Sequence, residues 1–445
     1  MIENFITNHS MAVSGAILLI AYVFIATEKI QKSVVALVGA GLALILGLLP
    51  FHGYFDSTAG VYVKSVFDYI AFDVIFLLVG MMILVNIASR SGVFKWMALQ
   101  LLKATKGHPK WVLFALAAFT AVASAFLDNV TTVVLMMPVT FVIAKEFETD
   151  PVPFLITEVL ASNIGGTATL IGDPPNIIIG ARAGLSFMDF VYELTDIVTL
   201  IFLVCIGILI FMFRKSLKTT PEKMAHIANI DNSKTITDKP LMIRSMIVLV
   251  LVILGFITHD KTGIPAYVFA LMGAAILLIF EKPKEIYEDV EWMTIFFFVG
   301  LFIIIGAFEA NGGISFLADK LIELTQGSLT AATMFILWGS GILSGIVDNI
   351  PYTATMAPLI AEVQHTLPYT AGIHQHHPLW WALSLGACLG GNLTIIGAAA
   401  NVIVSETAAS KNYPITFMRF MKYGALVTFI SLTLSSIYLY FRYLH

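Results

Sequence analysis

Residues 162–176 read Ser-Asn-Ile-Gly-Gly-Thr-Ala-Thr-Leu-Ile-Gly-Asp-Pro-Pro-Asn, and they interrupt an apolar segment that is otherwise long enough to enter a bilayer. Pro174 and Pro175 lack the N–H group that continues a helix, and the three glycines free the backbone further. We therefore expect two half-helices joined by an unwound link. Unwound backbone survives at membrane depth only where protein or a watery cavity covers it.

The same pattern returns in the second half of the chain as Gly-Gly-Asn-Leu-Thr-Ile-Ile-Gly-Ala-Ala-Ala-Asn, residues 390–401. An offset of 225 positions, from Gly165 to Gly390, aligns both glycine pairs, the threonines and the final asparagines. Interrupted apolar segments at matching places in two halves of a chain are the best sequence indication of a transporter's substrate site. The two stretches predict such a site.

Composition places the chain in the membrane. It has 445 residues, of which 58% are hydrophobic and 12% are charged, and its mean hydropathy is +0.89. These values are typical of an all-α polytopic membrane protein, with the lipid bilayer as its first partner. The net charge of −4 gives no support for nucleic-acid binding. Two cysteines, Cys205 and Cys388, suffice neither for a disulfide framework nor for a metal cluster, so we expect no metal and no cofactor.

A second pair of motifs extends the repeat. Asp128-Asn129 and Asp348-Asn349 break two apolar runs midway at an offset of 220 positions. We interpret the runs 111–146 and 331–364 as re-entrant hairpins, and the segments 153–184 and 378–409 as broken helices. The first repeat is then 8–213, the cytoplasmic linker is 214–242, and the second repeat is 243–442. Each repeat holds five crossings and one hairpin, and the odd number of crossings makes the repeats inverted.

The remaining crossings are uninterrupted apolar runs. They lie near 11–27, 33–50, 72–89, 194–213, 243–258, 264–280, 293–309 and 423–441. Residues 92–105 and 314–325 have the pattern of amphipathic helices at the two interfaces.

Basic residues predict the orientation. With the linker in the cytoplasm, twenty of the 25 Lys and Arg residues fall in inside loops. Both termini are then outside a cell (inner) membrane. The first hairpin enters from the cytoplasm and the second enters from outside.

Carboxylates within the predicted membrane segments are candidates for coupling a proton or Na⁺, because an unpaired charge there is costly. They are Asp128, Asp348, Asp173 and Glu158. Capping of a helix N-terminus is the alternative for the three aspartates. Asp173 is the asymmetric member, since Ala398 occupies its place in the second repeat.

Amides, hydroxyls and glycines of the same motifs, with the two hairpin-tip aspartates, form the predicted substrate-binding set. Its members are Asp128, Asn129, Thr132, Gly165, Gly166, Thr167, Thr169, Asn176, Asp348, Asn349, Gly390, Gly391, Asn392, Thr394 and Asn401. Half-helix N-termini favour anions and unwound carbonyls favour cations. The alternative for any one residue is a hydrogen bond between helices. We interpret Cys388 as a small packing residue, and the cluster His374, His376 and His377 as a solvated loop.

These motifs carry a family resemblance. Residues 162–176, together with Leu-Asp-Asn-Val-Thr-Thr at 127–132 and Val-Asp-Asn-Ile-Pro-Tyr-Thr at 347–353, resemble the ion transporter superfamily, in the branch of arsenite permeases, D-type sodium/proton antiporters and the melanosomal P protein. The resemblance implies two re-entrant hairpins that meet two broken helices, often in a homodimer. Sodium/dicarboxylate symporters of the superfamily carry Ser-Asn-Thr at the hairpin tips, whereas this chain has Asp-Asn-Val and Asp-Asn-Ile.

The leading hypothesis is a secondary transporter in which a small inorganic solute shares a site with a coupling proton or Na⁺. The resemblance favours proton-coupled arsenite or antimonite efflux, followed by sodium/proton antiport and, less favoured, sodium-coupled dicarboxylate transport. An ion channel is the alternative from another class. An enzyme is not expected, because no histidine lies in a predicted crossing to serve beside Asp128. Without an ATP-binding motif, a pump would need a partner ATPase.

Overall fold

The computed structural model describes residues 8–445 except 28, 57–60, 229–234, 368 and 370–375. The chain is an all-α polytopic membrane protein, which confirms the predicted fold class. In the described part, eight helices are long and apolar enough to cross a membrane: α2, α4, α7, α10, α12, α15, α17 and α21 with its extension η3. Shorter apolar helices accompany them, namely α3, α6, α8, α13 and α19.

The first half runs from α2 to α10. Its elements are α2 (Ser10–Thr27), α3 (Lys32–Ile45), β1 (Tyr54–Asp56), β2 (Val61–Val63), η1 (Val66–Tyr69), α4 (Phe72–Arg90), α5 (Val93–Ala104), α6 (Pro109–Ser124), α7 (Asn129–Phe147), α8 (Val152–Gly166), α9 (Pro174–Ala183) and α10 (Phe187–Phe213). The short antiparallel ladder of β1 and β2 was not foreseen from the sequence.

The second half follows the linker helix α11 (Pro221–Ala228). Its elements are α12 (Lys239–Thr262), α13 (Ala266–Leu278), α14 (Pro283–Glu288), α15 (Trp292–Ala310), α16 (Gly313–Leu324), α17 (Leu329–Val347), α18 (Asn349–Thr366), α19 (Pro378–Gly390), η2 (Ile395–Gly397), α20 (Ala399–Ser410), α21 (Phe417–Leu439) and η3 (Tyr440–Leu444). The pairs α6–α7 and α17–α18 occupy the predicted hairpins. The pairs α8–α9 and α19–α20 occupy the predicted broken helices.

Local backbone features repeat between the halves. Gly92 and Gly312 both have φ +80° and turn the chain from a long helix into α5 and α16. Only glycine adopts this conformation without steric cost. Gly80 of α4 and Gly300 of α15 permit close crossings, since an added Cβ would lie 2.8 Å from the backbone of Ala270 at Gly80 and 2.6 Å from that of Ala36 at Gly300.

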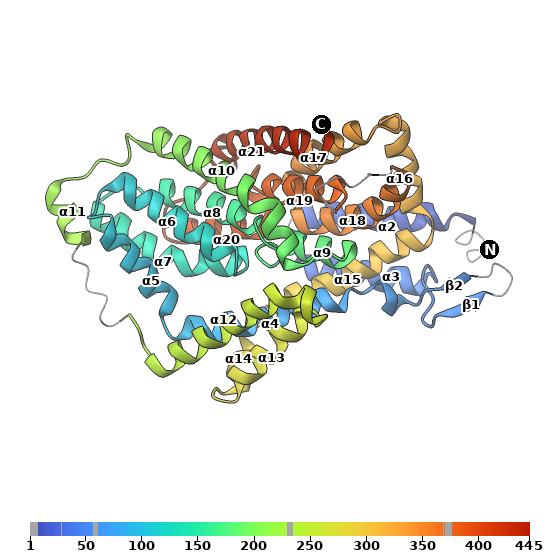
Figure 1. Cartoon of the computed structure of the whole chain (residues 1–445), viewed down its shortest axis with the longest axis horizontal. Helices are drawn as coiled ribbons and strands as arrows, with labels where there is room; N and C mark the ends of the chain where they lie inside the picture. Colours follow the sequence, from blue (N-terminus) through green and yellow to red (C-terminus); the bar gives the residue numbers. More distant parts are fainter. Residues whose placement is uncertain (1–7, 28, 57–60, 229–234, 368, 370–375) are drawn as a thin grey trace.

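The helices form two groups. In one, α3 packs on α15, and α4 packs on α13. In the other, α6 packs on α8, and α17 packs on α19. Figure 1 shows α4, α12, α13 and α14 along the lower edge and α10 and α21 along the upper edge, with α8, α9 and α19 between them. The broken helices thus lie inside the bundle.

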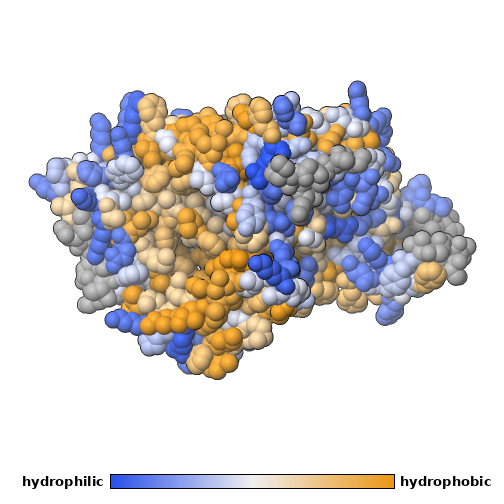
Figure 2. All heavy atoms as spheres, viewed as in Figure 1, coloured by the Kyte–Doolittle hydropathy of each residue, from blue (hydrophilic) through white to orange (hydrophobic). Residues whose placement is uncertain are grey.

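Polar segments gather at the two ends of the long axis. Figure 1 places the β1–β2 ladder at one end and α11 at the other. Hydrophobic side chains cover the middle of the face in Figure 2, and hydrophilic ones are frequent at both ends. The linker 214–242 contains a short helix that was not foreseen: α11 packs on α5 and α7, and Lys223 pairs with Glu148 at 2.7 Å. Residues 229–234 of the linker lie outside the described residues.

Candidate functional site

Four polar segments from the two halves meet inside the bundle. Helix α9 packs on α18 and α19, and α8 packs on α19 and α20. Consequently the hairpin tips at Asp128-Asn129 and Asp348-Asn349 and the two unwound links approach one another. The site residues proposed from the sequence belong to this meeting place.

Asp173 lies at its centre. It is 1% exposed and precedes Pro174, the first residue of α9, but its side chain makes no capping hydrogen bond. The Asn349 amide lies 3.3 and 3.4 Å from the two carboxylate oxygens of Asp173. Asn129 and the thiol of Cys388 also lie close to this carboxylate. Two repeat-related asparagines, one from each hairpin tip, therefore converge on a carboxylate that has no counterpart in the other repeat.

Asn176 and Asn401 hold the two unwound links in shape. The Asn176 amide donates to the carbonyls of Thr167 at 3.1 Å and Thr169 at 2.9 Å. The Asn401 amide donates in the same way to the carbonyls of Gly391 at 2.8 Å and Thr394 at 2.9 Å. Buried carbonyls need such partners when the helix ladder is interrupted. These two asparagines thus position the link backbone.

The two links are also joined to each other. Asn163 donates to the side-chain oxygens of Asn392 at 2.9 Å and Asn401 at 3.0 Å. From the second half toward the first, the Cys388 thiol approaches Asn176 Oδ1 at 3.4 Å, and the Ser384 hydroxyl donates to the same oxygen at 2.7 Å. Asn163 and Cys388 occupy equivalent places at the offset of 225 positions. Cys388 therefore contacts the site, in addition to the packing role predicted for it.

Asp128 and Asp348 are helix caps with different second partners. Asp128 accepts from the N–H of Thr131 at 2.8 Å and from its hydroxyl at 2.5 Å. Asp348 accepts from the N–H of Ile350 at 3.0 Å and pairs with the ammonium of Lys32 at 2.5 Å. The capping alternative therefore describes part of what these two aspartates do.

Threonines and glycines complete the contacts between hairpins and links. Thr169 donates to the carbonyl of Ala125, and Thr394 donates to the equivalent carbonyl of Gly345. Gly165 and Gly390 lie against the backbones of α6 and α17, where a side chain would collide. The other predicted members, Gly166, Thr167, Gly391 and Asn392, are also buried in the links.

Two buried oxygens of the meeting place have no hydrogen-bond partner among the described residues. They are the hydroxyl of Thr132 and Oδ1 of Asn163. Glu158, the fourth carboxylate of the predicted set, accepts from the hydroxyl of Thr140 in α7 at 2.5 Å. Glu158 is thus partnered by the first hairpin.

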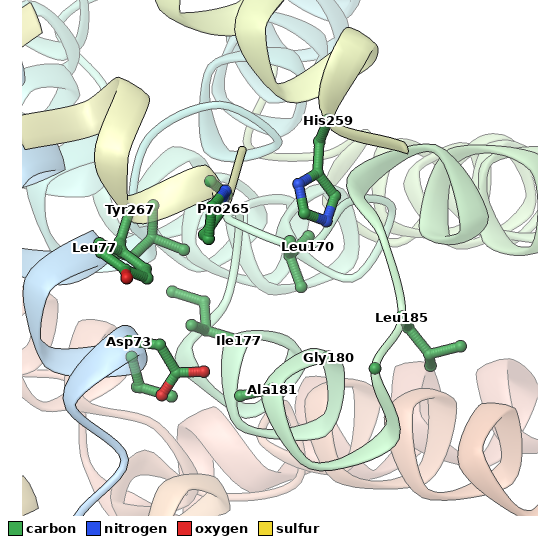
Figure 3. Close-up of a pocket in the computed structure, with 13 residues that line it drawn as sticks. Asp73, Leu77, Leu170, Ile177, Gly180, Ala181, Leu185, His259, Pro265 and Tyr267 are labelled. Atoms are coloured by element: carbon green, nitrogen blue, oxygen red, sulfur yellow. The ribbon is translucent and has the colours of Figure 1, made fainter. Parts of the chain in front are cut away.

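Two cavities related by the repeat lie at opposite ends of the bundle. One, of about 270 Å³, lies between the start of α4, helix α9 and the start of α13 (Figure 3). The other, of about 230 Å³, lies between the start of α15, helix α20 and the start of α3, and it reaches Asp348. Asp73 at the start of α4 and Glu309 at the end of α15 line a third cavity together, so α4 and α15 run antiparallel. The first two cavities therefore face opposite ends.

No group of three metal-ligating side chains occurs in the described part of the chain. Of the histidine cluster, His374 lies outside the described residues. His376 Nε2 lies 3.1 Å from Asp189 Oδ1, and this hydrogen bond raises the pKa of His376. Burial lowers the pKa of His377, which contacts the carbonyl of Leu367.

Sequence reasoning overlooked three residues of the site. Asn163 was not recognised because the equivalent residue in the second repeat is a cysteine, so the comparison of the repeats gives no matching amide there. Ser384 was hidden because it stands in an apolar half-helix without a polar equivalent. Lys32 was counted only as a loop charge. Its signal in the sequence was its place at the very start of an apolar run.

Comparisons with known proteins agree with this architecture. The sequence pattern of the family described as "Citrate transporter" matches residues 22–386. The "Uncharacterized transporter Rv2684" of Mycobacterium tuberculosis is 41% identical over 434 residues, which cover 97% of this chain and 98% of that protein. The "P protein" of Homo sapiens is 30% identical over 512 residues, which cover 96% of this chain and 59% of the P protein.

A solved structure shares the fold. The YdaH transporter of Alcanivorax borkumensis superposes with a TM-score of 0.57 at 14% identity, covering 92% of this chain and 98% of that one. The family match and the relatives named above confirm the resemblance to the ion transporter superfamily and its P protein branch. The chain belongs to the citrate transporter family of that superfamily and is an integral membrane secondary transporter rather than an enzyme.

Proposed function

We propose that the chain exchanges a proton or Na⁺ against a small inorganic solute at a site centred on Asp173, with proton-coupled arsenite or antimonite efflux as the first candidate. The observation that carries this proposal is the convergence of Asn129 and Asn349 on one buried carboxylate. A carboxylate inside a bilayer is costly when charged and unpaired. Asp173 therefore gains from taking up a proton or a metal cation.

The amides and the single carboxylate suit a neutral, hydroxylated solute. Arsenious acid carries three hydroxyl groups, which donate to a carboxylate and accept from amide N–H groups. The surroundings of Asp173 support this choice, because nearby Asp348 is paired with Lys32, whereas Asp173 has no cationic partner among the described residues. A free citrate trianion would meet repulsion there and would need to bring a cation with it.

Alternating access would use the two repeat-related cavities. In the predicted orientation, the cavity beside Lys32 opens toward the cytoplasm, and the cavity beside Asp73 opens outside. Sodium/proton antiport is the second candidate. It is favoured by the presence of Asp173 in one repeat only, because a single carboxylate can carry either a proton or Na⁺ in turn.

The test measures proton movement in proteoliposomes that contain a pH-sensitive dye. Arsenite, antimonite, Na⁺ and citrate, the last with and without a divalent cation, are added separately. We expect proton flux with arsenite or antimonite, and its loss in Asp173→Asn, Asn129→Ala and Asn349→Ala. The exposed Asp319→Asn variant serves as the matched control. Flux with Na⁺ alone would identify the antiporter, and an unchanged pH profile in Asp173→Asn would overturn the role of Asp173.

A further inference from the structure

Asp348 and Asp128 occupy equivalent places at the hairpin tips, but their second carboxylate oxygens have different partners. In the first repeat this oxygen accepts from the hydroxyl of Thr131. The equivalent residue in the second repeat is Pro351, which has neither a hydroxyl nor an N–H group. The second hairpin therefore leaves one carboxylate oxygen without a partner of its own.

Lys32 supplies the missing partner from another part of the fold. It is the first residue of α3, and its ammonium lies 2.5 Å from Asp348 Oδ2. Ala266, the first residue of α13, stands at the equivalent place beside the other cavity. The first helical position beside the cavity is thus a lysine in α3 and an alanine in α13.

The ion pair lies where an ion from solution can reach it. Both residues line the cavity of about 230 Å³, where the Lys32 side chain is 24% exposed and that of Asp348 is 3% exposed. The contact also joins the two groups of helices, because α3 packs on α15, whereas Asp348 belongs to the tip between α17 and α18. Tyr22 of α2 adds a hydrogen bond to the carbonyl of Pro351 at the same tip.

We propose that Lys32 is a tethered competitor for a monovalent metal cation, Na⁺, at Asp348, and that it holds the second hairpin in the present arrangement until that cation replaces it. This inference rests on the proposed cation-coupled function and adds to it a second cation position beside Asp173. When the ammonium leaves, the carboxylate of Asp348 needs another positive charge, since removing one partner of a buried pair leaves an uncompensated charge. Lys32 is therefore a positioning residue that sets the cation dependence.

The experiment compares wild type with Lys32→Met, which keeps an unbranched side chain, one atom shorter, but removes its charge. Thermal denaturation of the purified protein is followed against NaCl, with choline chloride at equal ionic strength as the reference. We expect Na⁺ to protect Lys32→Met at a concentration about tenfold lower than wild type, a factor of the size usual for interaction between two bound groups. Lys32→Arg should behave as wild type. So should Lys29→Met, which changes an exposed lysine three positions before Lys32.

The double variant Lys32→Met/Asp348→Asn tests the position of the cation and should lose the added Na⁺ protection. Equal Na⁺ dependence in wild type and Lys32→Met would overturn the proposal, and so would protection that survives in the double variant. If Lys32→Met does not fold, Lys32→Gln takes its place in the same series. Denaturation requires no transport, so these results are distinguishable from a failure of proton exchange in the Asp173→Asn experiment.

Discussion

Replacing Asn176 by alanine tests whether one side chain holds the first unwound link in shape. The substitution removes the donors to the carbonyls of Thr167 and Thr169 and the acceptor for the hydroxyl of Ser384. All three groups belong to buried residues. The link would then lose the two amide hydrogen bonds to its carbonyl groups.

The magnitude follows from these three groups. Hydrogen bonds between membrane helices average about 0.6 kcal/mol each by double-mutant cycles. Leaving a buried polar group unsatisfied costs about 1–3 kcal/mol. Two buried carbonyls lose their donors, whereas the Ser384 hydroxyl can rotate to another acceptor. We therefore expect the free energy of unfolding to fall by about 2–5 kcal/mol. Asn401→Ala should cost a similar amount, because it strands the carbonyls of Gly391 and Thr394.

The assay is thermal denaturation in detergent combined with solute uptake into proteoliposomes. Both alanine variants should denature several degrees below wild type and lose most of their transport. Asn8→Ala, at an exposed position near the N-terminus, is the control and should match wild type. Full transport and unchanged denaturation in Asn176→Ala would refute the argument that the side chain shapes the link.

Two further predictions concern packing and pH. Gly80→Ala should destabilise the fold by about 1–3 kcal/mol in denaturant titrations, because the new Cβ would lie 2.9 Å from the Cβ of Ala270. Gly207→Ala is the control: the new Cβ would meet open space, so the variant should be neutral or slightly stabilising. The hydrogen bond to Asp189 raises the pKa of His376. The stabilisation of the fold by this bond is therefore complete below the ordinary histidine pKa and is lost as the pH rises through the raised pKa. The denaturation temperature of wild type should fall across that window relative to His376→Gln, and parallel pH curves for the two proteins would contradict this origin.

The interruptions of the membrane segments were predictable because their causes are local. Gly165, Gly172, Pro174 and Pro175 limit the helix ladder through their own backbone chemistry, whatever surrounds them. The hairpin tips were predictable for a related reason, since a polar pair in an apolar run marks a helix start. Helix α11 and the β1–β2 ladder were missed because they are short: α11 has 8 residues and each strand has 3.

The roles of the individual polar residues could not be predicted in the same way. The sequence does not distinguish the four asparagines of the motifs. In the structure, Asn129 and Asn349 approach Asp173, whereas Asn176 and Asn401 hydrogen-bond to the carbonyls of the links. The difference depends on the direction in which each side chain leaves its helix. That direction is set when the hairpins and broken helices pack together.

The sequence by itself determined the membrane class, the two repeats and the places where helices break, because composition and backbone chemistry act over short distances along the chain. Only the tertiary structure decided which carboxylate receives both hairpin amides and which receives a lysine. Lys32 and Asp348 are separated by 316 positions, and Asn163 and Asn401 by 238. Contacts at such separations arise from how the two inverted halves pack against each other, and no local pattern encodes them.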